Sequence, residues 1–392
     1  MWLDSGESSS KTVLALGKHK EIKARGNEDL KLLQAWLNEH KDWAFGVFSY
    51  DLKNQLEELS SDNPSIIDFP DMYFFVPEIL LEKDGNTWNI YAQDSKFQVE
   101  SLVSKISNTK RMPASNQAEF EALESKEEYL NSISKIKDHI QLGDVYELNY
   151  CQAYSANSES INVFESFDLL RENIAGPFSS FAFLDGVYVL SSSPERFLKK
   201  DADRVFSEPI KGTIARSPDL KVDEQLKAQL ESSLKDRSEN VMIVDLVRND
   251  LSHIAQKATV EVEELCKVYS FPKVHQMISR VACKMNPELD LMDAIRYCFP
   301  MGSMTGAPKI RAMEIIEERE SFKRGWFSGS LGYFRPEGDF DFNVLIRTLF
   351  VDTKTKTALL PVGGAITILS DSESEYEETL LKSKGIRSLF ED

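Results

Sequence analysis

Stretches of β-type residues in this 392-residue chain follow one another without a helix between each pair. Aromatic and β-branched runs occur at residues 43–50 and 72–76, and again at residues 180–183 and 186–190. A barrel of parallel strands needs a crossover helix after each strand, so this order disfavours a barrel. The order predicts an α+β fold, in which a sandwich of large mixed or antiparallel β-sheets is covered by helices.

Apolar side chains at helical spacing mark the expected helices. Leu130, Ile133, Ile136 and Ile140 form one stripe, which ends near Gly143. Further helices are predicted at residues 30–37, 222–234 and 376–386, the second of which breaks or continues into residues 241–250. Later β runs are predicted at residues 330–335, 344–350 and 358–362.

Composition divides the chain into two parts. Residues 106–125 are polar and contain Pro113, which is typical of a connection. Residues 1–105 form a shorter N-terminal part and residues 126–392 a longer region. We expect the two parts to pack as one body.

The net charge of −18 disfavours nucleic acid as a partner, because phosphate binding needs a basic face. The charge leaves room for a small anionic metabolite in a local basic or metal-containing pocket. The four cysteines lack CxxC spacing, which favours buried thiols in a reducing compartment. We find neither a secretory signal nor an apolar run of about 18–20 residues, so a cytoplasmic protein without a membrane span is expected.

Two acidic pairs at i,i+3 spacing stand in segments with helical patterns. Asp236 and Glu239 form one pair, and Glu375 and Glu378 form the other. Each pair presents two carboxylates on one helix face. Four carboxylates on two helices can hold a hard cation such as Mg²⁺, while the alternative is a solvated acidic surface.

Lys211 and Glu195 are the candidate reactive groups. Lys211 lies in the motif Pro-Ile-Lys-Gly-Thr after a β-rich segment, and Gly212 allows a ligand to approach closely. It can act as a base or nucleophile if burial or a neighbouring charge lowers its pKa; otherwise it is a surface lysine. Glu195 can act as a general acid if burial raises its pKa; otherwise it is a helix cap or the partner of Arg196.

Other residues fit an anionic ligand. Thr305 lies in residues 299–309, a segment of small and hydroxyl residues that precedes a predicted helix and suits a carboxylate, while the alternative is an ordinary helix start. Gly363 and Gly364 follow a β run and predict an anion nest or a tight turn. Arg347, inside an apolar β run, needs an anionic partner, either internal or on a substrate. His275 can titrate near neutral pH, although a lone histidine is more often structural.

Common catalytic motifs are absent from the sequence. There is no GxGxxG, GxxxxGK[ST], HExxH or GxSxG, which disfavours the usual nucleotide-binding, zinc-protease and hydrolase functions. No cysteine occupies a Gly-x-Cys-x-Gly turn, so the chain shows no glutaminase nucleophile.

Taken together, the motifs resemble those of the chorismate-utilising enzymes, over residues 126–386 and more weakly over the first hundred. The resemblance implies that family's sandwich fold, with residues 126–392 as the chorismate-binding region and residues 1–105 as its shorter N-terminal part. Six stretches carry it, in the family's order: 143–150, 193–197, 209–213, 236–246, 306–309 and 375–379.

The resemblance also implies a branch of the family. Relatives that add water carry a lysine base in the strand equivalent to residues 145–154, and this chain has none there. Relatives that form anthranilate typically have alanine where this chain has Lys211. The lysine form is similar to the branch that aminates chorismate to 4-amino-4-deoxychorismate, an amino-transferring enzyme of 4-aminobenzoate and folate synthesis. That branch takes ammonia from a glutamine amidotransferase subunit.

By the same resemblance, Lys211 is the nucleophile and Glu195 the acid. Mg²⁺ would be bound directly by Glu239 and Glu378, with Asp236 and Glu375 in its outer shell. The implied substrate-binding residues are Gly212, Thr213, Thr305, Arg347, Gly363, Gly364, His275 and Gln276.

Three residues depart from the family's pattern. Some relatives have histidine where this chain has Gln276, beside His275. Ala365 replaces a frequent third glycine, and Ala215 replaces a common proline. Two alternatives stay open: an anthranilate-forming enzyme, which Lys211 disfavours, and a catalytically idle chorismate-binding subunit, which the intact reactive residues disfavour.

Overall fold

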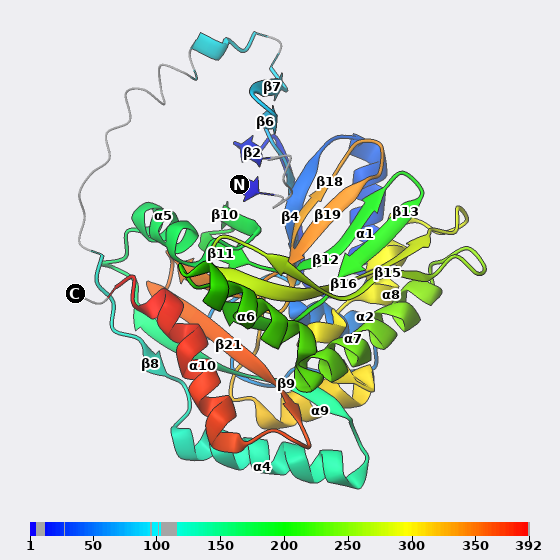
Figure 1. Cartoon of the computed structure of the whole chain (residues 1–392). Helices are drawn as coiled ribbons and strands as arrows, with labels where there is room; N and C mark the ends of the chain where they lie inside the picture. The colour runs from blue at the N-terminus through cyan, green and yellow to red at the C-terminus, as the bar shows by residue number, and fades with distance from the viewer. Residues whose placement is uncertain (5–11, 27, 95, 101, 103–115, 391–392) are drawn as a thin grey trace.

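Two large antiparallel β-sheets frame the molecule (Figure 1). The computed structural model describes residues 1–4, 12–26, 28–94, 96–100, 102 and 116–390, so the first half of the connection predicted at residues 106–125 lies outside the described residues. All strand pairs in the described chain are antiparallel, which confirms the predicted α+β sandwich and makes it wholly antiparallel.

The first sheet, sheet A, has eleven strands. Its two longest neighbours, β9 and β21, pair over their full lengths. In spatial order the strands are β17 (Gly306–Ala307), β9 (Glu147–Asn157), β21 (Thr357–Thr367), β20 (Thr348–Asp352), β11 (Val187–Ser193), β10 (Phe178–Leu184), β1 (Trp2–Asp4), β2 (Thr12–Leu16), β6 (Ile79–Asp84) and β7 (Thr87–Ala92), and β8 (Glu121–Ala122) also pairs with β9.

The second sheet, sheet B, has ten strands. Its spatial order is β14 (Ile210–Ala215), β16 (Val274–Lys284), β13 (Arg204–Glu208), β12 (Arg196–Asp201), β19 (Phe340–Val344), β18 (Ser330–Phe334), β4 (Ala44–Phe48), β5 (Met72–Val76) and β3 (Lys20–Ala24), and β15 (Glu261–Ser270) also pairs with β16. Strands from the first hundred residues therefore extend both sheets.

Helices cover both sheets. On sheet A, α5 and α10 bury Leu170 and Ile386 against a cluster that includes Leu190 and Leu360. On sheet B, α7 packs against β16. The longer helices are α1 (Asp29–His40), α4 (Lys126–Leu142), α5 (Val163–Ile174), α6 (Leu220–Ser232), α7 (Leu234–Ser252), α8 (Leu291–Cys298), α9 (Lys309–Arg319) and α10 (Ser372–Arg387), and the short ones are η1 (Tyr50–Leu52), α2 (Lys53–Leu56) and η2 (Gly302–Met304).

Local sequence explains where α4, α6 and α7 begin or end. Ser125 and Glu128 form a capping box that starts α4, and Gly143, at a φ of 83°, ends it. Ser233 separates α6 from α7, because its extended backbone stops one helix and its hydroxyl caps the other by accepting a hydrogen bond from the Asp236 N–H. This break puts Asp236 in the first turn of α7.

The β run predicted at residues 344–350 is wrong as a single strand. β19 ends at Val344 in sheet B and β20 begins at Thr348 in sheet A. The residues between them cross from one sheet to the other, and Arg347 has a φ of 50°. The apolar pattern continues from both buried strands into Leu345 and Ile346 of this crossing, so it could not reveal the break.

Within the described chain, no helix is both long enough and apolar enough to cross a membrane. The four cysteines are buried and unbridged, as the sequence predicts.

Candidate active site

Lys211 lies on β14, the edge strand of sheet B, at an irregularity in its pairing with β16. The next residue, Gly212, has a φ of 82°, and a Cβ atom there would lie 2.9 Å from the Asp236 side chain. Glycine therefore lets α7 approach the strand closely. The Lys211 side chain is only 10% exposed, which excludes the surface-lysine alternative.

The partner of Lys211 is Glu147, which the sequence analysis did not single out. Lys211 Nζ donates a hydrogen bond to Glu147 Oε1 at 2.7 Å. Glu147 is the first residue of β9, whose backbone pairs with Ala307 of β17 and Thr367 of β21. An acidic residue at the start of a buried, apolar strand was the available signal.

Opposing effects act on the Lys211 ammonium. Burial alone would lower the pKa of Lys211, but the carboxylates of Glu147, Glu239 and Glu195 outweigh it, so the pKa lies above its ordinary value. In this arrangement Lys211 is a buried cation, and its nitrogen lacks the free lone pair that a nucleophile needs.

Glu195 is buried at the turn between β11 and β12. Ser303 Oγ donates a 2.6 Å hydrogen bond to Glu195 Oε1. Burial raises the pKa of Glu195 to about 7, although Ser303 and Lys211 oppose the rise. Arg196 pairs with Glu208 and Asp341, and the side chains that act on the pKa of Glu195 are Ser303 and Lys211, which disfavours the predicted alternative of a Glu195–Arg196 pair. The geometry and pKa suit a general acid.

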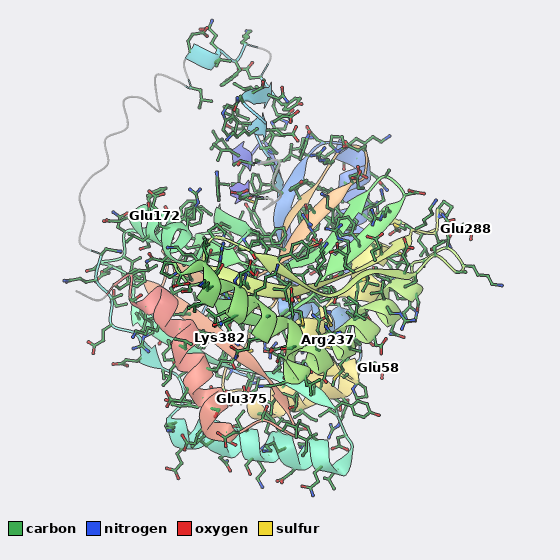
Figure 2. All side chains as sticks on the ribbon, in the orientation of Figure 1. Glu58, Glu172, Arg237, Glu288, Glu375 and Lys382 are labelled. Atoms are coloured by element: carbon green, nitrogen blue, oxygen red, sulfur yellow. The ribbon has the colours of Figure 1, made fainter. Side chains whose placement is uncertain are left out.

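The two acidic pairs lie on neighbouring helices and share a lysine. Lys235 Nζ on α7 lies 3.9 Å from Glu239 Oε1 and 3.7 Å from Glu375 Oε1 on α10. Glu378 instead pairs with Lys382 at 2.8 Å. Figure 2 labels Glu375 and Lys382 on α10. The ammonium of Lys235 thus bridges carboxylates of both helices.

The chemistry of this cluster suits a hard cation, although its side chains are turned toward lysines. Glu239 Oε1 is buried with no hydrogen-bond partner in the described chain, and burial raises the pKa of Glu239 to about 7. Among the described residues no three metal-ligating side chains are already grouped around one point. Oxygen donors are present, and a bound cation would need Glu239 and Glu378 to leave their lysine partners.

Arg347 lies in the crossing from β19 to β20. A second crossing lies beside it, from β11 of sheet A to β12 of sheet B, and contains Glu195. The Ser192 N–H donates to Arg347 O at 3.1 Å, and the Val344 N–H donates to Glu195 O at 3.0 Å. The Arg347 guanidinium has no ion pair among the described residues, and burial lowers its pKa. A buried guanidinium without an internal anion is suited to binding a ligand carboxylate.

Gly363 and Gly364 form neither the tight turn nor the anion nest that the sequence predicts, because both lie in β21, paired with Cys151 and Tyr150 of β9. A Cβ at position 363 would lie 2.4 Å from the Cys151 sulfur, so glycine is needed there for close strand packing. A Cβ at Gly364 would lie 3.5 Å from Glu375 Oε2, which places this residue beside the acidic cluster.

His275 and Gln276 differ in their surroundings. Both ring nitrogens of His275 already have hydrogen-bond partners in the protein. One lies 2.9 Å from Ser270 Oγ and the other 3.0 Å from Asp223 Oδ1. These contacts argue against its predicted role in substrate binding. Gln276 pairs in register with Thr213 and is 1% exposed, yet neither atom of its amide has a partner within the described chain. That amide can therefore bind a ligand.

Thr305 is fully buried after η2. Its hydroxyl donates to Met301 O at 3.2 Å, and its carbonyl accepts from the Asn149 N–H at 2.8 Å. Its segment leads into α9, which begins at Lys309 directly after Pro308. The predicted helix after this motif is thereby confirmed.

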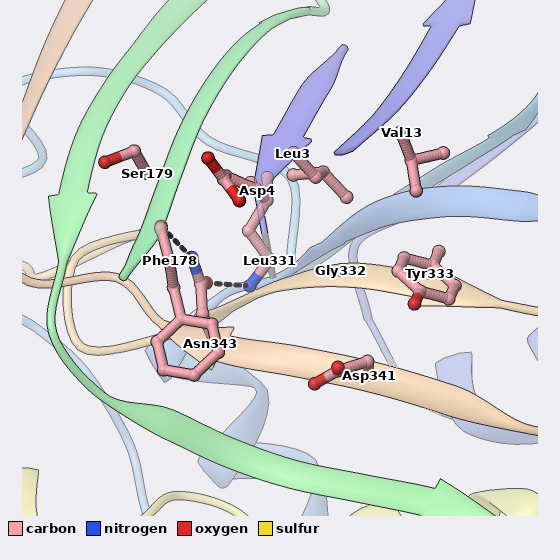
Figure 3. A pocket seen from close by; sticks show the side chains of 10 residues that line it. All are labelled: Leu3, Asp4, Val13, Phe178, Ser179, Leu331, Gly332, Tyr333, Asp341 and Asn343. Atoms are coloured by element: carbon pink, nitrogen blue, oxygen red, sulfur yellow. Dashed lines mark hydrogen bonds between the residues drawn. The ribbon is translucent and has the colours of Figure 1, made fainter. Parts of the chain in front are cut away.

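A separate small cavity lies between the two sheets near the N-terminus (Figure 3). Its volume is about 30 Å³, and Asn343 crosses it by bonding Phe178 O and the Leu331 N–H. Its lining includes none of the predicted site residues. The carboxylates of Glu147, Glu239 and Glu195 lie near Lys211 instead.

Comparison with known proteins identifies the family of the chain. Residues 1–388 match the family described as "chorismate binding enzyme". The chain is 33% identical over 382 residues to "Aminodeoxychorismate synthase component 1" of Escherichia coli (strain K12), covering 95% of this chain and 80% of the relative. It is 38% identical over 280 residues to "Probable aminodeoxychorismate synthase, chloroplastic" of Oryza sativa subsp. japonica, covering 71% of this chain but 31% of that longer relative. The crystal structure of anthranilate synthase component I from Streptococcus pneumoniae TIGR4 superposes with a TM-score of 0.85 at 26% identity, covering 97% of this chain and 93% of that one.

Proposed function

The chain belongs to the family of chorismate binding enzymes, and from that premise we propose that it aminates chorismate to 4-amino-4-deoxychorismate with ammonia. The observation that carries the proposal is the buried Lys211, which lies among carboxylates together with an acid, Glu195. Relatives named for this reaction support it.

Lys211 acts as the nucleophile in this proposal. Its amine attacks C2 of the ring, the two conjugated ring double bonds shift, and the C4 hydroxyl leaves as water with a proton from Glu195. Ammonia then attacks C4, the two double bonds shift back, and the lysine amine leaves C2. The new ammonium at C4 returns a proton to Glu195. The covalent route replaces one difficult displacement with two easier ones.

Three features bind and orient the substrate. The unpaired Arg347 guanidinium pairs with a substrate carboxylate, beside the crossing that holds Glu195. Gln276 supplies an unpartnered amide, and Thr213 lies opposite it on β14. The backbones of Gly212 and Gly364, which lie beside Asp236 and Glu375, complete the proposed contacts.

We propose that Glu239 and Glu378 bind Mg²⁺ directly, with Asp236 and Glu375 in the outer shell. Support comes from Glu239 Oε1, which is buried and accepts no hydrogen bond within the described chain, and from Lys235, whose ammonium bridges the two helices. When bound, Mg²⁺ would neutralise and orient a substrate carboxylate.

The amino donor comes from a partner in this proposal. The bacterial relative is named a component 1, and this chain lacks a recognisable glutaminase nucleophile. A glutamine amidotransferase subunit would supply the ammonia, as part of 4-aminobenzoate and folate synthesis.

Product analysis tests the function. The purified protein, given chorismate, Mg²⁺ and ammonium, is expected to form 4-amino-4-deoxychorismate without releasing pyruvate. Anthranilate formation is the second candidate function, because a solved anthranilate synthase component I shares the fold. Anthranilate and equimolar pyruvate as main products would replace the proposal with this candidate.

A further inference from the structure

We propose that Glu147 is the base that takes a proton from the Lys211 ammonium before the lysine attacks, and returns it after the lysine leaves. This inference rests on the proposed function, because it assigns the proton transfer that a lysine nucleophile needs. It concerns a residue to which the function proposed above gives no role.

Contact geometry singles out Glu147. Glu147 Oε1, 2.7 Å from Lys211 Nζ, is the sole hydrogen-bond acceptor of that ammonium in the part of the chain that the structure describes. The backbone of Glu147 is paired on both sides, so the carboxylate is held on a rigid element. The 2.7 Å distance from Lys211 Nζ to Glu147 Oε1 allows direct proton transfer without an intervening water.

The other nearby carboxyls have other tasks. Glu195 has to begin protonated to release the hydroxyl, and its Oε1 accepts from Ser303. Glu239 pairs with Lys235 and is a proposed ligand of the cation. Glu147 is therefore the acceptor that remains among the three carboxylates acting on Lys211.

Burial favours the transfer. Glu147 is almost fully buried, and its Oε2 has no hydrogen-bond partner among the described residues. The carboxylate is thus stabilised mainly by the lysine, and keeping two charges away from water is costly. Proton transfer converts this buried ion pair into a neutral amine and a neutral acid, and a substrate that excludes water would favour that neutral pair.

The proton balance closes over one cycle. The proton moves from Lys211 Nζ to Glu147, which frees the nitrogen lone pair for the bond to C2. The lysine later leaves C2 as a neutral amine when ammonia has bonded to C4. Glu147 then returns its proton to Lys211, which restores the ion pair.

Glu147→Gln tests the proposal, because glutamine keeps the size and an acceptor oxygen but cannot take the proton. With chorismate, Mg²⁺ and ammonium, kcat at pH 7 is expected to fall about 100-fold, the lower range for losing a positioned base. The loss should shrink as pH rises, because Lys211 can then release its proton to solvent, while Glu239 and Glu195 still face it. The KM for chorismate should change less than about threefold.

Glu124→Gln is the matched control. Glu124 is also a buried carboxylate, but it bonds the hydroxyl of Tyr150 on β9, and no ion pair or hydrogen bond joins it to Lys211. This variant should keep the wild-type pH profile, and thermal unfolding should show that both variants fold.

The outcomes separate the two proposals. A wild-type protein that forms no 4-amino-4-deoxychorismate overturns the proposed function, and the role of Glu147 with it. An active wild-type protein whose Glu147→Gln variant keeps full kcat at pH 7 overturns only the role of Glu147. A loss of equal size at every pH, or one confined to KM, would assign Glu147 to structure and also overturn that role.

Discussion

Ser303 donates its hydroxyl proton to Oε1 of Glu195, 108 residues away in sequence, at 2.6 Å. This hydrogen bond stabilises the ionised carboxylate and so opposes the rise in pKa that burial causes. The pKa of about 7 is therefore a balance between burial on one side and Ser303 with Lys211 on the other.

Ser303→Ala is expected to raise the pKa of Glu195 further. A general acid works in its protonated form, so wild-type kcat should fall as pH rises past about 7. Without the hydroxyl, Glu195 stays protonated to higher pH, and the alkaline limb of the kcat profile should move upward. Ser330→Ala, which removes another buried hydroxyl bonded to Asn343 O, is the control and should leave the profile unchanged. An unmoved limb in Ser303→Ala would remove Glu195 from the acid role.

Lys211→Ala should reduce formation of 4-amino-4-deoxychorismate by at least about 100-fold, because the route through C2 loses its nucleophile. Residual chemistry should shift toward direct attack of ammonia at C2 and hence toward anthranilate. Chromatographic product analysis measures both compounds. Near-normal product formation would reduce Lys211 to an electrostatic lining residue.

Glu378→Gln should weaken Mg²⁺ binding and turnover, while thermal unfolding changes little. The variant removes one anionic oxygen ligand, and its present partner, Lys382, lies on the same helix. Turnover titrated with Mg²⁺ gives the apparent affinity. Glu377→Gln, one residue away and exposed, is the control. Equal Mg²⁺ dependence in both variants would assign Glu378 to the solvated surface.

Arg347→Met should raise the KM for chorismate by about 10- to 100-fold, because a hydrogen bond to a charged group contributes about 1.5–3 kcal/mol. The free protein should be no less stable, since the variant removes a buried charge that has no ion-pair partner in the described chain. Arg335→Met, which breaks the pair with Glu82 at 2.9 Å, should leave KM unchanged. A KM for Arg347→Met within twofold of wild type would contradict the carboxylate contact.

His275→Gln and Gln276→Leu should separate stability from catalysis. The first breaks contacts with Ser270 and Asp223, so the melting temperature should fall while KM stays the same. The second removes an amide without partners, so stability should hold or rise while turnover of chorismate falls. The reverse pattern would exchange the roles of the two residues.

Local patterns predicted the fold class and most elements. The stripe from Leu130 to Ile140 marks α4 because a buried helix face repeats every 3.6 residues. The successive aromatic runs mark strands for the same kind of local reason. Between Val344 and Thr348 the pattern fails, since Leu345 and Ile346 of the crossing are as apolar as the strands it joins.

Prediction of the site depended on resemblance rather than on spacing. Glu147 was missed because one carboxylate in a strand forms no pattern, and its partner Lys211 lies 64 residues away. His275 was chosen for its chemistry, although its position in β16 turns it toward Asp223. Which side chains meet is decided by strand register and sheet crossing, and neither can be read from a local segment.

The sharing of both sheets by the first hundred residues has a consequence for fragments of this chain. In a fragment that begins at residue 126, β10 would lose β1 and β18 would lose β4. Each sheet would then end in a strand whose backbone N–H and C=O groups have no partner. Such open edges pair readily with other chains, so this fragment should self-associate rather than remain monomeric.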